Sequence, residues 1–164
     1  MIAIVLAIET GLNIVAGDIS ARALHVAKAN QRRHELQGQI DFIQTDLFGA
    51  FQRQQNFSLI VSNPPYIAKI DVENNLAPEV SAFEPHLALD GGDQGMELIS
   101  QIRNTLPVQL APGGQVFMEI GADQGGVVKS LFENRLKGLP EFRFVEILCD
   151  YAGRDRVLHA ILED

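Results

Sequence analysis

Residues 57–66, FSLIVSNPPY, decide the fold class. The first six residues form a short apolar run of strand length, which predicts a buried strand. Two consecutive prolines cannot continue an interior strand, so the strand must end at Ser62 and a loop must begin at Asn63. The sequence therefore predicts a buried strand that leads directly into a polar loop.

Apolar stretches of strand length alternate with helical patterns on both sides of this strand. Further strands are predicted at residues 13–17, 40–44, 115–120, 142–148 and 156–161. Helices are predicted at residues 20–36, with Ser20 as the cap, and at 96–110 and 125–136. Residues 1–9 fit a strand or a helix, and their alanines favour the helix. Residues 67–94 are predicted to be a long functional loop, and residues 112–114 a turn.

This alternation predicts an α/β fold with one domain over residues 1–164: a doubly wound, mostly parallel sheet with helices on both faces. The last two strands have only a short connection. They therefore predict a terminal antiparallel strand, because a parallel crossover needs about a dozen residues. In such sheets ligands bind at the carboxyl ends of the strands. Asp18, Asp46 and Asn63 stand at or just after such ends, so we expect the site there.

The composition narrows the classes of function. Hydrophobic residues make up 46% and charged residues 21%, as in a packed globular domain. The net charge of −8 disfavours nucleic acid as a direct substrate, because the mean field repels phosphates. No Cys/His cluster has metal-ligand spacing, and the single Cys149 fits a reducing cytoplasm. The apolar run at residues 2–8 is shorter than the roughly 20 residues of a membrane span, and no basic residue precedes it as in a signal peptide.

Two acidic residues are candidates for binding a nucleoside cofactor. Asp18, at the end of a strand, can accept hydrogen bonds from both ribose hydroxyls, and a turn or helix cap before Ser20 explains it equally well. Asp46 could accept a hydrogen bond from an adenine amino group, with Leu47 covering the adenine face. Taken alone, Asp46 and Leu47 fit a simple loop better.

Residues 63–66, Asn-Pro-Pro-Tyr, carry the strongest chemical indication. The side-chain carbonyl of Asn63 and the main-chain carbonyl of Pro64 can accept the two N–H bonds of a planar nitrogen, in an amide or an aromatic amine. That arrangement orients the nitrogen toward an electrophilic methyl group. Pro64 and Pro65 stiffen the loop, and Tyr66 can pack against the flat target. The alternative is a proline turn capped by Asn63.

Residues 60–67 resemble the signature of S-adenosylmethionine-dependent amino-methyltransferases. Further segments narrow the resemblance: EPHLALDGGDQG at residues 84–95, PGG at 112–114, EIGADQG at 119–125 and AGRDR at 152–156. Together they resemble the HemK/PrmC family, which methylates the side-chain amide of a glutamine in peptide-chain release factors. The resemblance runs from end to end of the chain.

The resemblance implies a Rossmann-like methyltransferase sheet, S-adenosyl-L-methionine as cofactor and a release factor as protein partner. It implies that Asp18 binds the ribose and that Asp46 and Leu47 flank the adenine. It also implies that Asn63, Pro64, Pro65 and Tyr66 hold the target amide, with Asn63 also contacting the cofactor. For Glu119 and Arg154 structural roles are predicted: a buried, paired carboxylate and a brace of the last hairpin.

Members of the HemK/PrmC family carry a glycine-rich loop after a first strand, and a helical amino-terminal domain. No Gly-x-Gly precedes Asp18, so the resemblance implies that these parts are missing here. A fragment, a split or decayed enzyme, and a chain completed by a strand from a partner chain are all open explanations. Methylation of a protein glutamine is the favoured function. Methylation of an exocyclic amine of DNA or RNA bases and a non-catalytic binding role are the alternatives.

Overall fold

The computed structural model describes residues 1–52, 57–74, 76 and 85–164. Contacts divide the chain into two compact units, Met1–Gln52 and Arg53–Asp164, and each is described by itself. The single domain expected over residues 1–164 stays a prediction. Glu84, which opens one of the family-like segments, lies outside the described residues.

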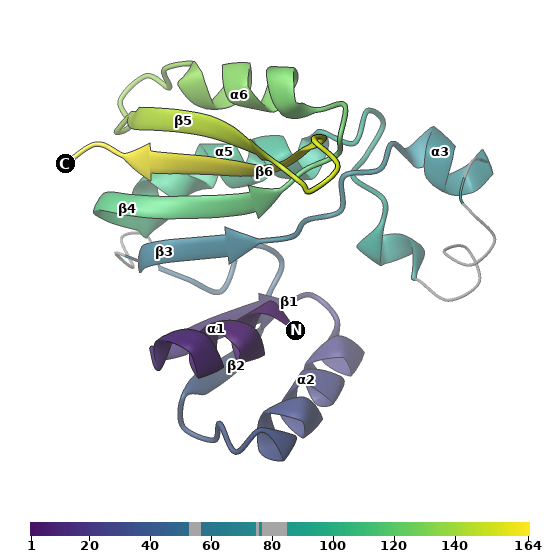
Figure 1. The fold of residues 1–164 in the computed structure, drawn as a ribbon, viewed down its shortest axis with the longest axis vertical. Coiled ribbons are helices and arrows are strands. Elements are labelled where there is room, and N and C mark those ends of the chain that lie inside the picture. The colour runs from purple at the N-terminus through teal and green to yellow at the C-terminus, as the bar shows by residue number, and fades with distance from the viewer. Residues whose placement is uncertain (53–56, 75, 77–84) are drawn as a thin grey trace. The chain divides into compact units, whose positions relative to one another are not determined.

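The first unit is a two-stranded parallel sheet with two helices (Figure 1). Its elements in chain order are α1 (Ile2–Thr10), β1 (Ile14–Asp18), α2 (Ala21–Arg33) and β2 (Ile40–Gln44). The Oγ of Ser20 accepts a hydrogen bond from the main-chain N–H of Ala23 at 3.2 Å, so Ser20 caps α2 as predicted. A small core forms around Ile4, Ala7, Leu36 and Ile40.

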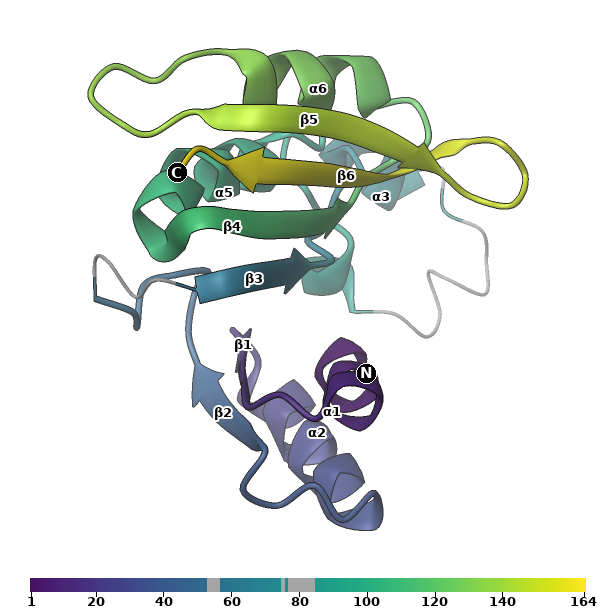
Figure 2. The ribbon, with the colours of Figure 1, turned by 60° about the vertical axis from the view of Figure 1, so that its left-hand side comes forward.

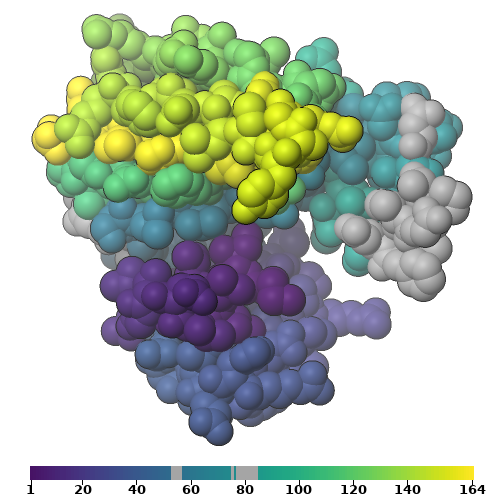
Figure 3. Space-filling model, in the orientation of Figure 1, coloured from purple at the N-terminus to yellow at the C-terminus, as the bar shows by residue number. Residues whose placement is uncertain are grey.

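Helix α1 is apolar on all sides. Ile4 and Ala7 are buried, whereas Ile2, Val5 and Ile8 are 40%, 48% and 52% exposed. Its side chains, purple in Figure 3, form part of the surface of this unit. Since no polar face interrupts the apolar residues, their spacing alone could not distinguish a helix from a strand.

The second unit contains a four-stranded sheet in the order β3-β4-β6-β5 (Figure 2). Its strands are β3 (Phe57–Ser62), β4 (Leu110–Glu119), β5 (Phe142–Cys149) and β6 (Asp155–Leu162). β3 and β4 are parallel, and β6 is antiparallel to both β4 and β5. Three strands therefore share one direction and only the last strand of the chain opposes them, which confirms the predicted fold class.

Two helices, α5 (Glu97–Gln109) and α6 (Gly125–Glu133), cover one face of this sheet (Figures 1 and 2). The core between helices and strands contains Ile99, Ile102, Leu106, Val116, Met118, Val128, Phe132, Leu158 and Ala160. On the other face the rings of Phe117 and His159 stack at 4.2 Å. The core therefore fixes the strand ends from which the loops of the candidate site emerge.

Two details differ from the sequence prediction. The prediction of a turn at residues 112–114 is wrong. Strand β4 already begins at Leu110, and residues 112–114 form a bulge between the pairs Phe57↔Leu110 and Leu59↔Gln115. A Cβ at Gly114 would lie 2.9 Å from the carbonyl oxygen of Phe57, so only glycine lets the bulge stay close to β3. The stretch at residues 67–94 also contains helix α3 (Lys69–Asn74) and the 3-10 helix η1 (His86–Ala88).

Within the described residues, β1 pairs only with β2 and β3 pairs only with β4. None of the helices in the described part of the chain is both long and apolar enough to cross a membrane.

Candidate active site

Residues 63–66 follow directly on β3, as predicted from the two prolines. Asn63 is exposed and Pro64 is buried. Within the described part of the chain, neither the Asn63 side chain nor the Pro64 carbonyl oxygen accepts a hydrogen bond. Among the described residues, both oxygens therefore keep their capacity to accept a further N–H group.

The segment at residues 89–95 binds the chain just after this loop. The main-chain N–H of Ile67 donates to Leu89 at 3.1 Å, and that of Gly91 donates back to Ile67 at 2.9 Å. A Cβ at Gly91 would lie 2.8 Å from the Pro65 carbonyl oxygen, and one at Gly95 would overlap the Tyr66 carbonyl. The glycines of this family-like segment therefore allow two stretches of main chain to pack directly against each other.

A single side chain, that of Gln124, connects three loops. Its Nε2 donates to the carbonyl oxygens of Tyr66 at 2.9 Å and Gly95 at 3.3 Å. Its Oε1 accepts from the main-chain N–H of Gly121 at 2.8 Å. The turn after β4 is thereby tied to the loop after β3 and to the glycine-rich segment.

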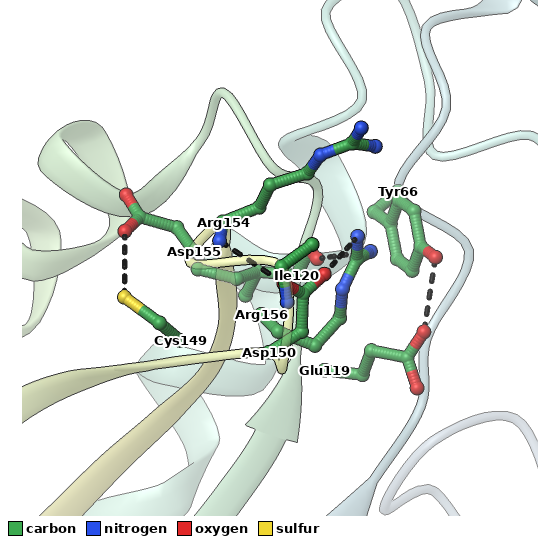
Figure 4. A network of polar contacts seen from close by, with 9 residues as sticks. Tyr66, Glu119, Ile120, Cys149, Asp150, Arg154, Asp155 and Arg156 are labelled. Carbon is green, nitrogen blue, oxygen red and sulfur yellow. Dashed lines mark hydrogen bonds and ion pairs between the residues drawn. The ribbon is translucent and has the colours of Figure 1, made fainter.

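Tyr66 is held at its hydroxyl as well. This hydroxyl donates to Oε1 of Glu119 at 3.0 Å, and Arg156 lies in the same network (Figure 4). Burial, and then the hydrogen bond to Glu119, raise the pKa of Tyr66 above its ordinary value of 10.0, against an opposing effect of Arg156. Tyr66 is an uncharged donor at neutral pH. Glu119 is paired, as the sequence predicted, but it is half-buried and not buried.

The last hairpin is braced by Asp150, not by the side chain of Arg154, which is exposed. Asp150 Oδ1 accepts from the main-chain N–H groups of Ala152 at 2.9 Å and Arg154 at 3.0 Å, and Oδ2 lies 3.4 Å from Arg156. The predicted brace is thus present, but Arg154 contributes its main chain. A short polar side chain beside a turn can satisfy several main-chain donors, which the exposed Arg154 side chain cannot.

Replacing Asp150 by asparagine is expected to destabilise the hairpin in a pH-dependent way. The hydrogen bonds from Arg154 and Ala152, and the Arg156 guanidinium, hold the pKa of Asp150 below its ordinary 3.8. The parent therefore gains stability above pH 3.8 and loses it as the pH falls below that value.

Thermal unfolding followed by tyrosine fluorescence, at pH 7 and at about pH 3, measures the difference in stability between the parent and Asp150→Asn. Both tyrosines, Tyr66 and Tyr151, belong to the second unit. Asp93→Asn, the same chemical change at an exposed position, is the matched control. A gap between parent and Asp150→Asn that stays constant with pH would contradict the charge-assisted bonds.

In the first unit, Asp18 is the last residue of β1, and Asp46 follows shortly after β2. Asp18 Oδ1 accepts a hydrogen bond from the Ser20 N–H at 2.8 Å. This is the turn contact that the sequence offered as an alternative to ribose binding. Asp46 is exposed, and Leu47 has a left-handed φ of 44°. Since that conformation is uncommon for leucine, it favours a functional loop.

Thr45 was not recognised from the sequence. Its hydroxyl accepts from the Ala50 N–H at 2.9 Å and donates within the turn, while its main-chain N–H donates to Asp18 at 3.0 Å. Thr45 thus joins the end of β1 to the loop that carries Asp46 and Leu47. A lone threonine at a strand end gives no sequence signal for this role.

The structure brings the predicted residues together in two groups. Asp18, Asp46 and Leu47 lie around the strand ends of the first unit, and residues 63–66 lie at a strand end of the second. The union of both groups into one site stays a prediction. Gln124 was missed as a site residue, although the resemblance had already singled out its segment, residues 119–125.

The profile of the methyltransferase small domain family matches residues 1–93, which is more than half of the chain. The chain belongs to the methyltransferase small domain family. Curated relatives of this methyltransferase-family chain are named release factor glutamine methyltransferase. That of Cereibacter sphaeroides is 40% identical over 148 residues, covering 90% of this chain and 50% of the relative. That of Thermosynechococcus vestitus is also 40% identical, covering 90% of this chain and 49% of the relative.

These names confirm the predicted resemblance to HemK/PrmC. The chain spans about half the length of the curated relatives it matches. Solved structures support the methyltransferase fold alone. A methyltransferase from Pyrococcus furiosus gives a TM-score of 0.67 at 14% identity, covering 100% of this chain and 70% of that one. The catalytic domain of hMettl16, in complex with the MAT2A 3′UTR hairpin 1, gives 0.70 at 14% identity, covering 99% and 61%.

Proposed function

We propose that this chain carries out methyl transfer from S-adenosyl-L-methionine to the side-chain amide nitrogen of a glutamine in a peptide-chain release factor. The observation that carries the proposal is the loop at residues 63–66. It presents two carbonyl acceptors, of Asn63 and Pro64, that no group in the described residues uses, on a main chain fixed by Gln124. The relatives' names favour a glutamine amide over a base amine.

A primary amide matches the two acceptors of this loop. It has two N–H bonds, and the Asn63 side chain and the Pro64 carbonyl can accept one each. The amide lone pair is delocalised, so orientation and stabilisation of the developing charge contribute more than a strong base. Beside the loop lies a depression of about 290 Å³, lined among others by Tyr66, Gln124 and Arg156, which can take part of a polypeptide substrate.

The cofactor is assigned to residues whose chemistry fits its donors. Asp18 uses one carboxylate oxygen on Ser20, so the other oxygen can accept from the ribose hydroxyls. Asp46 is exposed and can accept from the adenine amino group, and Leu47 can cover the adenine face. When bound, the group would supply an electrophilic methyl, and Asn63 is also assigned to contact it.

The residues of the chain then perform three tasks. Asn63 and Pro64 orient the amide nitrogen and accept its N–H bonds as positive charge develops on it. Tyr66, which is uncharged at neutral pH, packs against the flat amide without adding charge. The amide nitrogen becomes acidic only as the new bond forms, so its proton can leave afterwards to solvent.

The proposal is tested by calorimetric titration of the chain with S-adenosylhomocysteine, followed by an assay with radiolabelled methyl donor and an unmethylated bacterial release factor. The expected result is binding and label on one glutamine, located by mass spectrometry. Binding without label on the release factor, but with label on DNA or RNA, would replace the substrate class. A folded chain that neither binds nor transfers would refute the proposal.

Replacing Asp18 by alanine is expected to weaken S-adenosylhomocysteine binding at least about tenfold, since hydrogen bonds to a charged group contribute about 1.5–3 kcal/mol. Calorimetric titration measures the dissociation constant. Asp41→Ala, which removes an exposed carboxylate from β2 in the same unit, is the control and should bind as the parent does. An unaltered dissociation constant for Asp18→Ala would refute the ribose contact.

Two further assignments accompany this function. A cytoplasmic location fits a release-factor substrate and the single free Cys149. Among the described residues β1 pairs only with β2 and β3 only with β4, which is compatible with a strand supplied by a partner chain. Analytical ultracentrifugation of the purified chain, alone and with a candidate partner, tests the second assignment.

A further inference from the structure

We infer that Gln124 and Glu119 are positioning residues that hold Tyr66 from both ends and so fix the acceptor loop for methyl transfer. The inference rests on the proposed function and names two residues that act on its site through Tyr66. Glu119 ends β4 and Gln124 lies in the turn after it, whereas Tyr66 follows β3. Figure 4 shows the contact between Tyr66 and Glu119.

The two contacts fix different parts of Tyr66. The amide Nε2 of Gln124 donates to its main-chain carbonyl at 2.9 Å, and Oε1 of Glu119 accepts from its hydroxyl at 3.0 Å. The first contact fixes the peptide next to Pro65, and the second fixes the direction of the ring. A tyrosine with both ends bound keeps little rotational freedom, which reduces the entropy lost when a substrate packs against it.

Gln124 has the right chemistry for its place and few substitutes. It must donate to two carbonyl oxygens, of Tyr66 and Gly95, and accept from the N–H of Gly121. Only a primary amide carries both a double donor and an acceptor on one short side chain. A glutamate there would keep the acceptor, but would place its second oxygen against two carbonyl oxygens.

The glycines around Gln124 support the same inference. A Cβ at Gly121 would lie 3.0 Å from Oε1 of Gln124, and one at Gly95 would lie 3.0 Å from its Nε2. Both positions are buried. The two glycines therefore let the Gln124 amide come close to the main chain on both sides.

Gln124→Glu is the variant that removes the contacts to Tyr66 and Gly95 without preventing folding. Glutamate has the size of glutamine and keeps the contact to Gly121, so the second unit is expected to fold. Methyl transfer is expected to lose about 10- to 100-fold in kcat, since a misplacement of 1 Å costs about 100-fold. The KM for the donor should change little, because the lost interaction acts on orientation. Gln101→Glu, the same change at an exposed position of α5, is the matched control.

Tyr66 itself provides a readout that does not depend on activity. The chain has two tyrosines and no tryptophan, so Tyr151→Phe leaves Tyr66 as the single intrinsic fluorophore of its class. In this background Gln124→Glu should lower the fluorescence anisotropy of Tyr66. Glu119→Gln should lower the pKa of Tyr66 in an absorbance titration of tyrosinate, whereas Glu146→Gln, at an exposed position of β5, should not.

The outcomes separate the inference from the proposed function. Lower anisotropy together with lower kcat supports the inference that Gln124 fixes Tyr66 and that this fixation contributes to the reaction. Lower anisotropy with an unchanged kcat overturns the positioning role while leaving the methyltransferase function intact. Unchanged anisotropy in Gln124→Glu overturns the inference that Gln124 fixes Tyr66. A parent chain that transfers no methyl group refutes the proposed function and the catalytic role of the hold together.

Discussion

Asn63→Ala is expected to lower methyl transfer by about 100- to 1,000-fold, the cost of removing one oriented electrostatic partner from a reacting centre. Asn63 is exposed, and within the described residues its side chain has no hydrogen-bond partner. Its removal therefore breaks no hydrogen bond within the described part of the chain, and the effect should fall on turnover. S-adenosylhomocysteine affinity is expected to change far less than kcat.

The measurement is a single-turnover assay with radiolabelled donor and release factor, with calorimetry on the same samples. Asn63→Asp, which keeps a carbonyl-like acceptor in the same place, should retain more activity than Asn63→Ala. Asn104→Ala, at an exposed position of α5, is the control for removal of an asparagine. Turnover by Asn63→Ala at the rate of the parent would remove Asn63 from the mechanism.

Arg103→Ala is expected to lower the free energy of unfolding of the second unit by about 2–5 kcal/mol, the range for truncating a large buried side chain. Arg103 is 1% exposed and lies between two rings, its guanidinium carbon 5.5 Å from the centre of Phe132 and 4.9 Å from that of Phe142. Its Nη2 donates to the Asn134 carbonyl at 2.8 Å. Burial lowers the pKa of Arg103.

Arg103→Met should cost much less, within about 1 kcal/mol of the parent. Nε and Nη1 of Arg103 have no hydrogen-bond partner among the described residues, a cost of about 1–3 kcal/mol each. That cost offsets the ring contacts, at about 0.5–2 kcal/mol each, and the hydrogen bond to Asn134. Methionine fills most of the volume without the unpaired donors.

Urea unfolding followed by tyrosine fluorescence measures both variants, because both tyrosines lie in the second unit. Arg154→Ala, at an exposed position, is the control and should change stability by less than about 0.5 kcal/mol. An equal loss for Arg103→Met and Arg103→Ala would show that the charge, and not the packing volume, stabilises this layer.

Local patterns predicted the elements well where chain chemistry is decisive. Two prolines ended β3 at Ser62, and Ser20 began α2. They failed at residues 112–114, where Pro-Gly-Gly predicted a turn and the structure has a bulge. The same glycines can serve either conformation, and the pairing of β4 with Phe57 of β3 selects the bulge.

Arg103 shows a second limit of sequence patterns. It shares a helical face with Ile99, Ile102 and Leu106, all buried, so the periodicity of α5 places it toward the core. Residue type argues the opposite, because arginine is seldom fully buried. Only the two phenylalanine rings and the Asn134 carbonyl, from α6, β5 and the connection between them, explain why it lies inside.

The sequence by itself determined the α/β class and the end of β3 at Ser62, and it predicts the two carbonyl acceptors of Asn63 and Pro64. These follow from bonds and dihedral preferences of neighbouring residues. Only the tertiary structure decided that Gln124 and Glu119 hold Tyr66, that glycines 91 and 95 pack against the same loop, and that Thr45 ties Asp46 to Asp18. These contacts join residues that are distant in the chain, and their hydrogen bonds depend on the packing that brings the strand ends together.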